Sequence, residues 1–183
     1  KSLEDLLNPK YKGKFVMPDP TQHTTTLQWI ASLYKIMGKE KAEKFTRDLG
    51  ATKPLLVESL APAAERVSTA ETPLGISLVR YVVTFSEKGA PVDYVRLGKM
   101  LSLGQYIALS SKASRPNSGK AFIDFFLGDE SMRMLAKQGE FVNRQGIYPS
   151  LPDADKIEAV EMDDFDAQGF KEKTQEYQKI FLK

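Results

Sequence analysis

The sequence predicts an α/β fold with a largely parallel sheet, and two observations lead to that prediction. Short apolar runs, such as residues 15–17 and 73–77, are each followed by a segment whose apolar residues recur at helical spacing. Strands that alternate with helices are typical of parallel sheets, because a parallel connection has to cross back over the sheet. The composition agrees with a buried core, since 42% of the 183 residues are hydrophobic and 10% are aromatic.

The individual elements follow from the spacing of apolar residues and from the residues that interrupt it. In the first long helix Leu27, Ile30 and Leu33 begin an apolar stripe, and Gly38 ends it. The expected helices cover residues 21–37, 39–49, 62–68, 78–87, 117–127, 131–137 and 165–181. The expected strands cover residues 15–17, 73–77, 91–97 and 103–109, and residues 55–57 are either a strand or the approach to a helix.

Charge and composition exclude several classes of function. The chain has 26 basic and 24 acidic residues without a block of lysine or arginine, so we expect no nucleic-acid partner. It contains no cysteine, which excludes disulfides, thiolate metal sites and cysteine nucleophiles. No apolar run approaches the roughly 20 residues that span a bilayer. No signal peptide is found, and the opening Lys-Ser-Leu-Glu suggests a mature product, a trimmed product or a piece of a longer protein.

The first candidate binding segment is Thr21–Thr25, which follows a short apolar strand and Pro-Asp-Pro. The first backbone N–H groups of a helix have no partner within the helix, so they can hold an anion or a polar oxygen. Hydroxyl and imidazole side chains in the same turn add further hydrogen-bonding groups. The alternative is that Thr21 or Thr24 simply caps the helix. His23 is the only histidine and has no second ligand beside it, so we expect no dedicated metal site.

The second candidate segment runs from Ser77 to Tyr81, where another strand leads directly into a helix. Ser77 is placed to cap that helix, and the planar guanidinium of Arg80 suits a carboxylate or phosphate. The alternative places Arg80 on the solvated face and Tyr81 in the core. No serine-nucleophile elbow, phosphate loop or dinucleotide motif is present, so the sequence favours neither an enzyme nor a cofactor.

Three blocks of the sequence resemble the periplasmic solute-binding proteins of ABC importers. Residues 3–20 read Leu-Glu-Asp-Leu-Leu-Asn-Pro-Lys-Tyr-Lys-Gly-Lys-Phe-Val-Met-Pro-Asp-Pro, and residues 87–92 read Glu-Lys-Gly-Ala-Pro-Val. Residues 113–131 read Ala-Ser-Arg-Pro-Asn-Ser-Gly-Lys-Ala-Phe-Ile-Asp-Phe-Phe-Leu-Gly-Asp-Glu-Ser. The blocks occur in family order, and they are most similar to the branch that binds ferric iron, phosphonates and small organic anions.

The resemblance implies a two-lobe fold with a cleft that closes on the ligand, and it implies that this chain holds only part of it. Residues 1–97 would form the body of the carboxyl-terminal lobe, residues 98–150 would cross over to complete the amino-terminal lobe, and residues 151–183 would return. The rest of the amino-terminal lobe would then be a missing partner. Without it, residues 103–109 and the face of Phe122, Phe125 and Phe126 would remain an exposed apolar surface.

The resemblance also assigns ligand-binding residues, and one departure from the iron-binding pattern narrows the chemical class of the expected ligand. The residues that correspond to family contacts are Thr21, Gln22, His23, Thr24, Thr25, Ser77, Arg80 and Tyr81. Iron-binding relatives place two adjacent tyrosines near the second segment, whereas Tyr81 is followed by valine here. An arginine beside a single tyrosine suits an organic anion, such as a carboxylate or phosphonate, better than bare ferric ion.

The resulting prediction is a periplasmic or extracellular solute-binding component of an ABC importer, which passes a polar or anionic ligand to membrane subunits without chemistry. Two other functions stay open at this point. One is a ligand-sensing domain of a transcription regulator with the same fold, and the other is a small α/β enzyme. The native amino terminus separates the solute receptor from the regulator, because a secretory signal indicates the receptor and a helix-turn-helix indicates the regulator.

Overall fold

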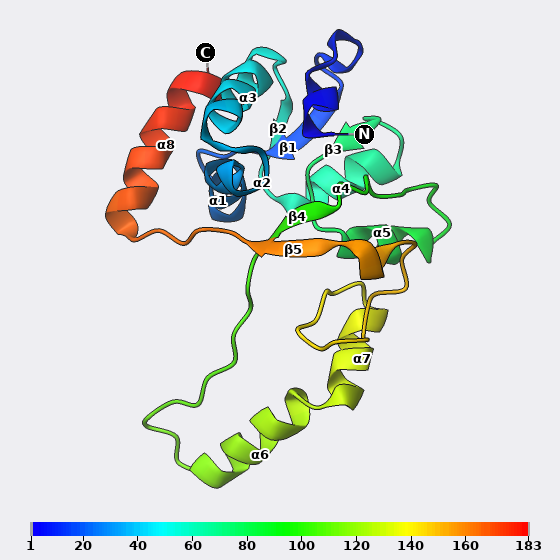
Figure 1. Cartoon of the computed structure of the whole chain (residues 1–183), viewed down its shortest axis with the longest axis vertical. Helices are drawn as coiled ribbons and strands as arrows, with labels where there is room; N and C mark the ends of the chain where they lie inside the picture. The colour runs from blue at the N-terminus through cyan, green and yellow to red at the C-terminus, as the bar shows by residue number, and fades with distance from the viewer. Residues whose placement is uncertain (1, 183) are drawn as a thin grey trace.

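The computed structural model describes residues 2–182, which divide into two regions (Figure 1). Most of the chain forms a body around a three-stranded sheet. Residues 103–150, which we call the excursion, leave this body and extend away from it. A pair of short strands links the two regions. Among the described residues, no helix is long and apolar enough to cross a bilayer.

The sheet of the body is parallel, as the alternation of apolar runs and helices predicts. The central strand is the most deeply buried, since Phe15, Val16 and Met17 expose at most 1% of their surface. Such a strand is apolar throughout because both of its faces are covered. In spatial order the strands are β2 (Leu55–Val57), β1 (Phe15–Pro18) and β3 (Leu74–Gly75).

Helices cover this sheet and supply most of the core. The core joins Phe15 and Met17 of the sheet to Leu33, Phe45 and Tyr177. The α-helices of the body are α1 (Thr24–Ser32), α2 (Tyr34–Met37), α3 (Lys39–Ala51), α4 (Leu60–Ser68), α5 (Arg80–Ser86) and α8 (Ala167–Phe181). The 3₁₀ segments are η1 (Leu3–Leu7), η2 (Pro9–Tyr11) and η3 (Ala154–Lys156).

Several predicted elements need correction. Residues 91–97 and 103–109, all of which the structure describes, form no strand. The strand in this part of the chain is β4 (Lys99–Ser102), which pairs in parallel with β5 (Glu158–Glu161). The apolar run 103–109 fails to become a strand because β5 ends opposite Ser102 and offers it no further partner. The helix predicted from position 21 begins at Thr24, and residues 55–57 are a strand.

The excursion is thinly packed. It consists of an extended connector followed by α6 (Pro116–Phe126) and α7 (Asp129–Lys137) (Figure 1). None of the described residues of α6 is buried, and Phe125 exposes 60% of its surface. The buried cluster that holds the rest of this region together is small and contains Met132, Ala136 and Ile147.

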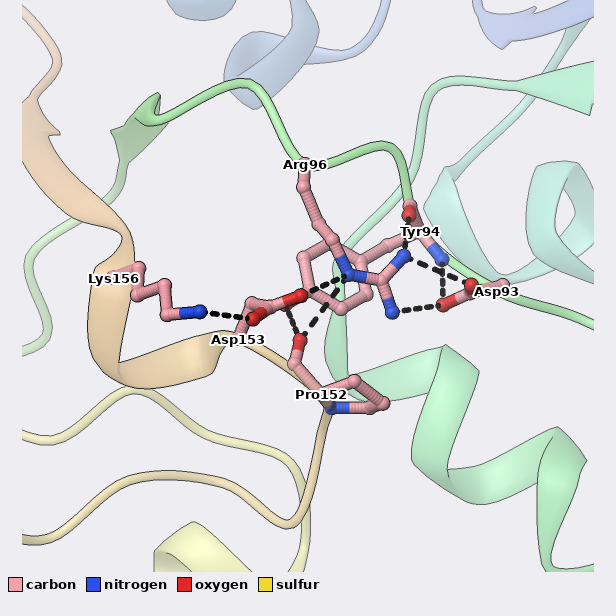
Figure 2. Close-up of polar contacts among 6 residues, drawn as sticks. All are labelled: Asp93, Tyr94, Arg96, Pro152, Asp153 and Lys156. Carbon is pink, nitrogen blue, oxygen red and sulfur yellow. Dashed lines mark hydrogen bonds and ion pairs between the residues drawn. The ribbon is translucent and has the colours of Figure 1, made fainter.

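A polar junction anchors the excursion where β4 and β5 begin (Figure 2). The Arg96 guanidinium donates to both carboxylate oxygens of Asp93, at 2.9 and 3.2 Å. Its Nε lies 3.2 Å from an Asp153 carboxylate oxygen and donates to the Pro152 carbonyl at 3.3 Å. The Tyr94 hydroxyl donates to the same Pro152 carbonyl. The junction therefore joins the stretch that leads into β4 to the stretch that leads into β5.

Candidate ligand-binding site

The parallel sheet brings the two predicted binding segments to one edge of the body. Because β1, β2 and β3 run in the same direction, the chain leaves all three at their shared carboxyl edge. The segments after β1 and β3 are the ones predicted to bind. Two contacts tie the edge together: the Asp19 N–H donates to the Val57 carbonyl at 2.8 Å, and the Ser77 hydroxyl donates to the Leu60 carbonyl at 2.6 Å.

Asp19 organises the turn between β1 and α1. One of its carboxylate oxygens accepts the Thr21 N–H at 2.8 Å and the Thr21 hydroxyl at 2.7 Å. The other accepts the Gln22 side-chain amide at 3.2 Å. The Asp19 carbonyl accepts the N–H groups of Gln22 and His23. The backbone amides of residues 21–23 are therefore satisfied within the turn.

His23 is the cap of α1, whereas the alternative interpretation of the sequence had given that role to Thr21 or Thr24. Its Nδ1 accepts the Thr26 N–H at 3.3 Å and lies 3.0 Å from the Thr26 hydroxyl. Partial burial lowers the pKa of His23, because burial disfavours the charged imidazole. The ring is then neutral near pH 7, which suits its role as an acceptor.

The first turn of α1 keeps two amides free. Within residues 2–182, the backbone N–H groups and hydroxyls of Thr24 and Thr25 form no hydrogen bond to the protein. Thr24 is exposed and Thr25 is half-buried, so solvent reaches this turn. A helix start of this kind can hold a polar or anionic group.

The second segment is arranged differently from the prediction. Ser77 does not cap α5, because its hydroxyl binds the Leu60 carbonyl and Val79 is the residue that precedes the helix. Arg80 forms an ion pair of 2.9 Å with Glu140 of the excursion. Tyr81 lies half-buried, with its ring centroid 5.1 Å from the Arg80 guanidinium carbon. The hydrogen bonds to Tyr81 and Glu140 raise the pKa of Arg80, which keeps it charged.

A shallow hollow of about 600 Å³ lies along the same edge, beside the ends of β1 and β2. Of the predicted site residues only Gln22 lines it. The other lining residues are Asp19, Leu56, Val57, Glu58, Pro62 and Arg66. The described part of the chain contains no cluster of three or more metal-ligating side chains.

Sequence reasoning missed two residues of this edge. Asp19 had a usable signal, since aspartate commonly accepts the N–H of the residue two positions on in a turn. Glu140 had none, because it lies 60 positions from Arg80 in the sequence. The two predicted segments share the edge, but they differ in what holds them. Thr24 and Thr25 keep free donors, whereas the Asp19 carboxylate holds Thr21 and Gln22, and Glu140 holds Arg80.

A polar helix start and an arginine thus lie at the carboxyl edge of a parallel sheet, and the arginine is paired with the excursion. A sequence profile of the bacterial extracellular solute-binding proteins matches residues 1–139. The chain therefore belongs to that family.

Other proteins are similar to this chain at low sequence identity. An uncharacterized protein of Haemophilus influenzae is 23% identical over 142 residues, which are 76% of this chain and 41% of that protein. The periplasmic binding protein P5PA is 25% identical, with a TM-score of 0.59 over 98% of this chain and 60% of P5PA.

Two further structures support the fold. A Bordetella ferric binding protein is 18% identical with a TM-score of 0.62, over 98% of this chain and 62% of that one. AfuA of Actinobacillus pleuropneumoniae, solved with fructose 6-phosphate bound, is 19% identical with a TM-score of 0.56, over 100% of this chain and 58% of AfuA. The chain thus spans about 60% of P5PA and 41% of the Haemophilus relative.

Proposed function

We propose that this chain is part of the solute-binding component of an ABC importer and that it works in the periplasm or outside the cell. Membership in the extracellular solute-binding family supports this role. The observation that carries the proposal is the pair of unpartnered N–H groups at Thr24 and Thr25 on the carboxyl edge. The protein captures a solute there and hands it to membrane subunits, and no chemical step is required.

The proposed ligand is a small polar or anionic solute. Thr24 and Thr25 provide backbone and hydroxyl donors, and Arg80 provides a guanidinium suited to a carboxylate or phosphate. Gln22 and Tyr81, together with Thr21, His23 and Ser77 of the same two segments, are the further contacts in this proposal. Tyr81 has no tyrosine beside it, so the proposed solute is an organic anion rather than bare ferric ion.

The exposed apolar face of the excursion supports the proposal that a second lobe, which this chain lacks, packs against it. Phe122 and Phe125 expose 56% and 60% of their surface on α6, and Tyr106 on the connector exposes 85%. Large exposed apolar surfaces are typical of interaction sites. In the proposed division, residues 1–97 and 151–183 form one lobe, and residues 98–150 pack on the lobe that this chain lacks.

A thermal-shift screen against small carboxylates, phosphate esters and phosphonates tests the binding function. A ligand that binds only the folded protein raises its melting temperature, and the shift grows with ligand concentration. We expect a stabilising ligand for the unmodified protein and no shift for the double variant Thr24→Ala, Arg80→Ala.

The matched control is Thr174→Ala with Arg133→Ala, which changes the same residue types on α8 and α7. This control is expected to keep the full ligand-induced shift. An equal shift in both double variants would place binding elsewhere on the molecule and overturn the proposed site.

A further inference from the structure

An ion pair between Arg80 and Glu140 joins the excursion to a charged residue of the proposed site. Arg80 follows β3 at the carboxyl edge, whereas Glu140 lies just beyond α7. The Arg80 Nη1 and the Glu140 Oε1 are 2.9 Å apart. Both side chains are partly exposed, at 41% and 33%, so a solute from the solvent can reach the pair.

Glu140 leaves the guanidinium of Arg80 incompletely paired. It binds only Nη1, while the Arg80 Nε is buried and has no partner anywhere in the described part of the chain. A guanidinium presents its N–H groups as a fork that fits two oxygens of one carboxylate or phosphate. The existing pair therefore uses less of that fork than a two-oxygen anion would.

The backbone holds Glu140 in place, which separates this pair from a loose surface ion pair. The preceding Gly139 has a φ of +90°, a conformation that favours glycine. A Cβ on Gly139 would lie 2.7 Å from the Cα of Arg80, so only glycine permits this approach. The N–H groups of Gly139 and Glu140 are also bonded to carbonyls of α7, at Ala136 and Leu135. The carboxylate is thus presented to Arg80 by a fixed turn.

We propose that Glu140 is an internal competitor that occupies Arg80 until the carboxylate or phosphate of a solute displaces it. This proposal rests on the proposed function, since it concerns the same site. Displacement exchanges a single hydrogen bond for a two-oxygen contact with the guanidinium. The site then selects solutes whose anion offers two oxygens, and their binding frees the turn at residue 140 from the edge.

The test uses the full chain with inorganic phosphate as the probe, and it follows the side-chain Nε–H signal of Arg80 by NMR. In the ligand-free protein, Glu140→Gln is expected to move this signal, because the ion pair is lost. Phosphate is expected to move the signal in both proteins. The apparent dissociation constant for phosphate should be about two- to fivefold lower in Glu140→Gln, the range expected when a partly exposed ion pair no longer competes.

Glu158→Gln is the matched control, because it removes the Lys99–Glu158 pair of 3.0 Å, which lies on the β4–β5 pair rather than at the edge. This control should leave both the Arg80 signal and the phosphate affinity unchanged. Equal affinity in Glu140→Gln and the unmodified protein would overturn the proposal, and so would an Arg80 signal that does not respond to phosphate. The proposed function would survive either result if a solute still shifted the amide signals of Thr24 and Thr25, and it fails separately if none does.

Discussion

Helices α3 and α6 are similar in length and pattern but differ in what surrounds them. Along α3, Ala42, Phe45 and Leu49 are buried against the sheet and the neighbouring helices. Along α6, Phe122 and Phe125 lie at comparable spacing and remain exposed. The apolar stripe of a helix thus predicts that a partner is needed, but it does not say whether the same chain supplies that partner.

The largest expected effect comes from truncating the core of the body. Phe45→Ala removes a ring that is 2% exposed, and such changes cost about 3 to 5 kcal/mol of unfolding free energy. Phe125→Ala on α6 should cost less than about 0.5 kcal/mol, as surface changes do. Urea denaturation followed by circular dichroism measures both values. Similar losses of unfolding free energy for the two variants would show that α6 is packed in solution, and α3 and α6 would then no longer differ.

A smaller effect is expected from adding a single methyl group at matched glycines. In Gly50→Ala the new Cβ would lie 2.5 Å from the Ile180 side chain and 2.7 Å from its carbonyl oxygen, so α3 and α8 must separate. Overpacking of this kind costs about 1 to 3 kcal/mol. In Gly119→Ala on α6 the new Cβ meets only the end of the Leu109 side chain, which can move. The Gly119→Ala variant should be as stable as the unmodified protein or more stable, because alanine favours a helix over glycine by about 1 kcal/mol. Thermal denaturation of both variants measures the difference, with a lower melting temperature expected for Gly50→Ala alone.

The junction between the regions should respond more weakly still. Arg96→Met removes the links to Asp93, Asp153 and the Pro152 carbonyl (Figure 2). We expect faster amide hydrogen exchange in β4 and β5, with little change in the exchange of β1. Lys99→Met, which removes only an exposed ion pair of β4, is the control. Uniformly faster exchange through the sheet would mean that the junction stabilises the body as well.

The smallest expected effect is a pH dependence at Asp153. The hydrogen bond and charge of Lys156, together with Arg96, lower the pKa of Asp153 from its usual value of 3.8. A lowered folded-state pKa gives stability that is present above the unfolded pKa and lost as pH falls through the folded pKa. The unmodified protein should therefore lose slightly more stability than Asp153→Asn between about pH 5 and about pH 2. Parallel curves for the two proteins would argue that the ion pairs of the junction do not persist in solution.

Much of the body could be predicted from the sequence because its signals are local. Apolar runs mark β1 and β3, and spacing marks the helices that follow them. The β4–β5 pair was missed because its strands are short, half polar and separated by more than fifty residues, so each carries little pattern of its own. Within the site, the shared edge follows from parallel topology, whereas the pairing of Arg80 with Glu140 depends on where the excursion returns. No local pattern encodes that return.

The parallel pairing of β4 with β5 has a mechanical consequence. The chain enters the excursion from the Ser102 end of the ladder and comes back to it at the Glu158 end, so the excursion is attached at two separate points. These points are about 10 Å apart, the length of a four-residue strand. Side-chain contacts add to these two chain connections, since Tyr106 donates to Glu161 and Glu140 pairs with Arg80. A swing of the excursion about the ladder therefore requires these contacts to break first.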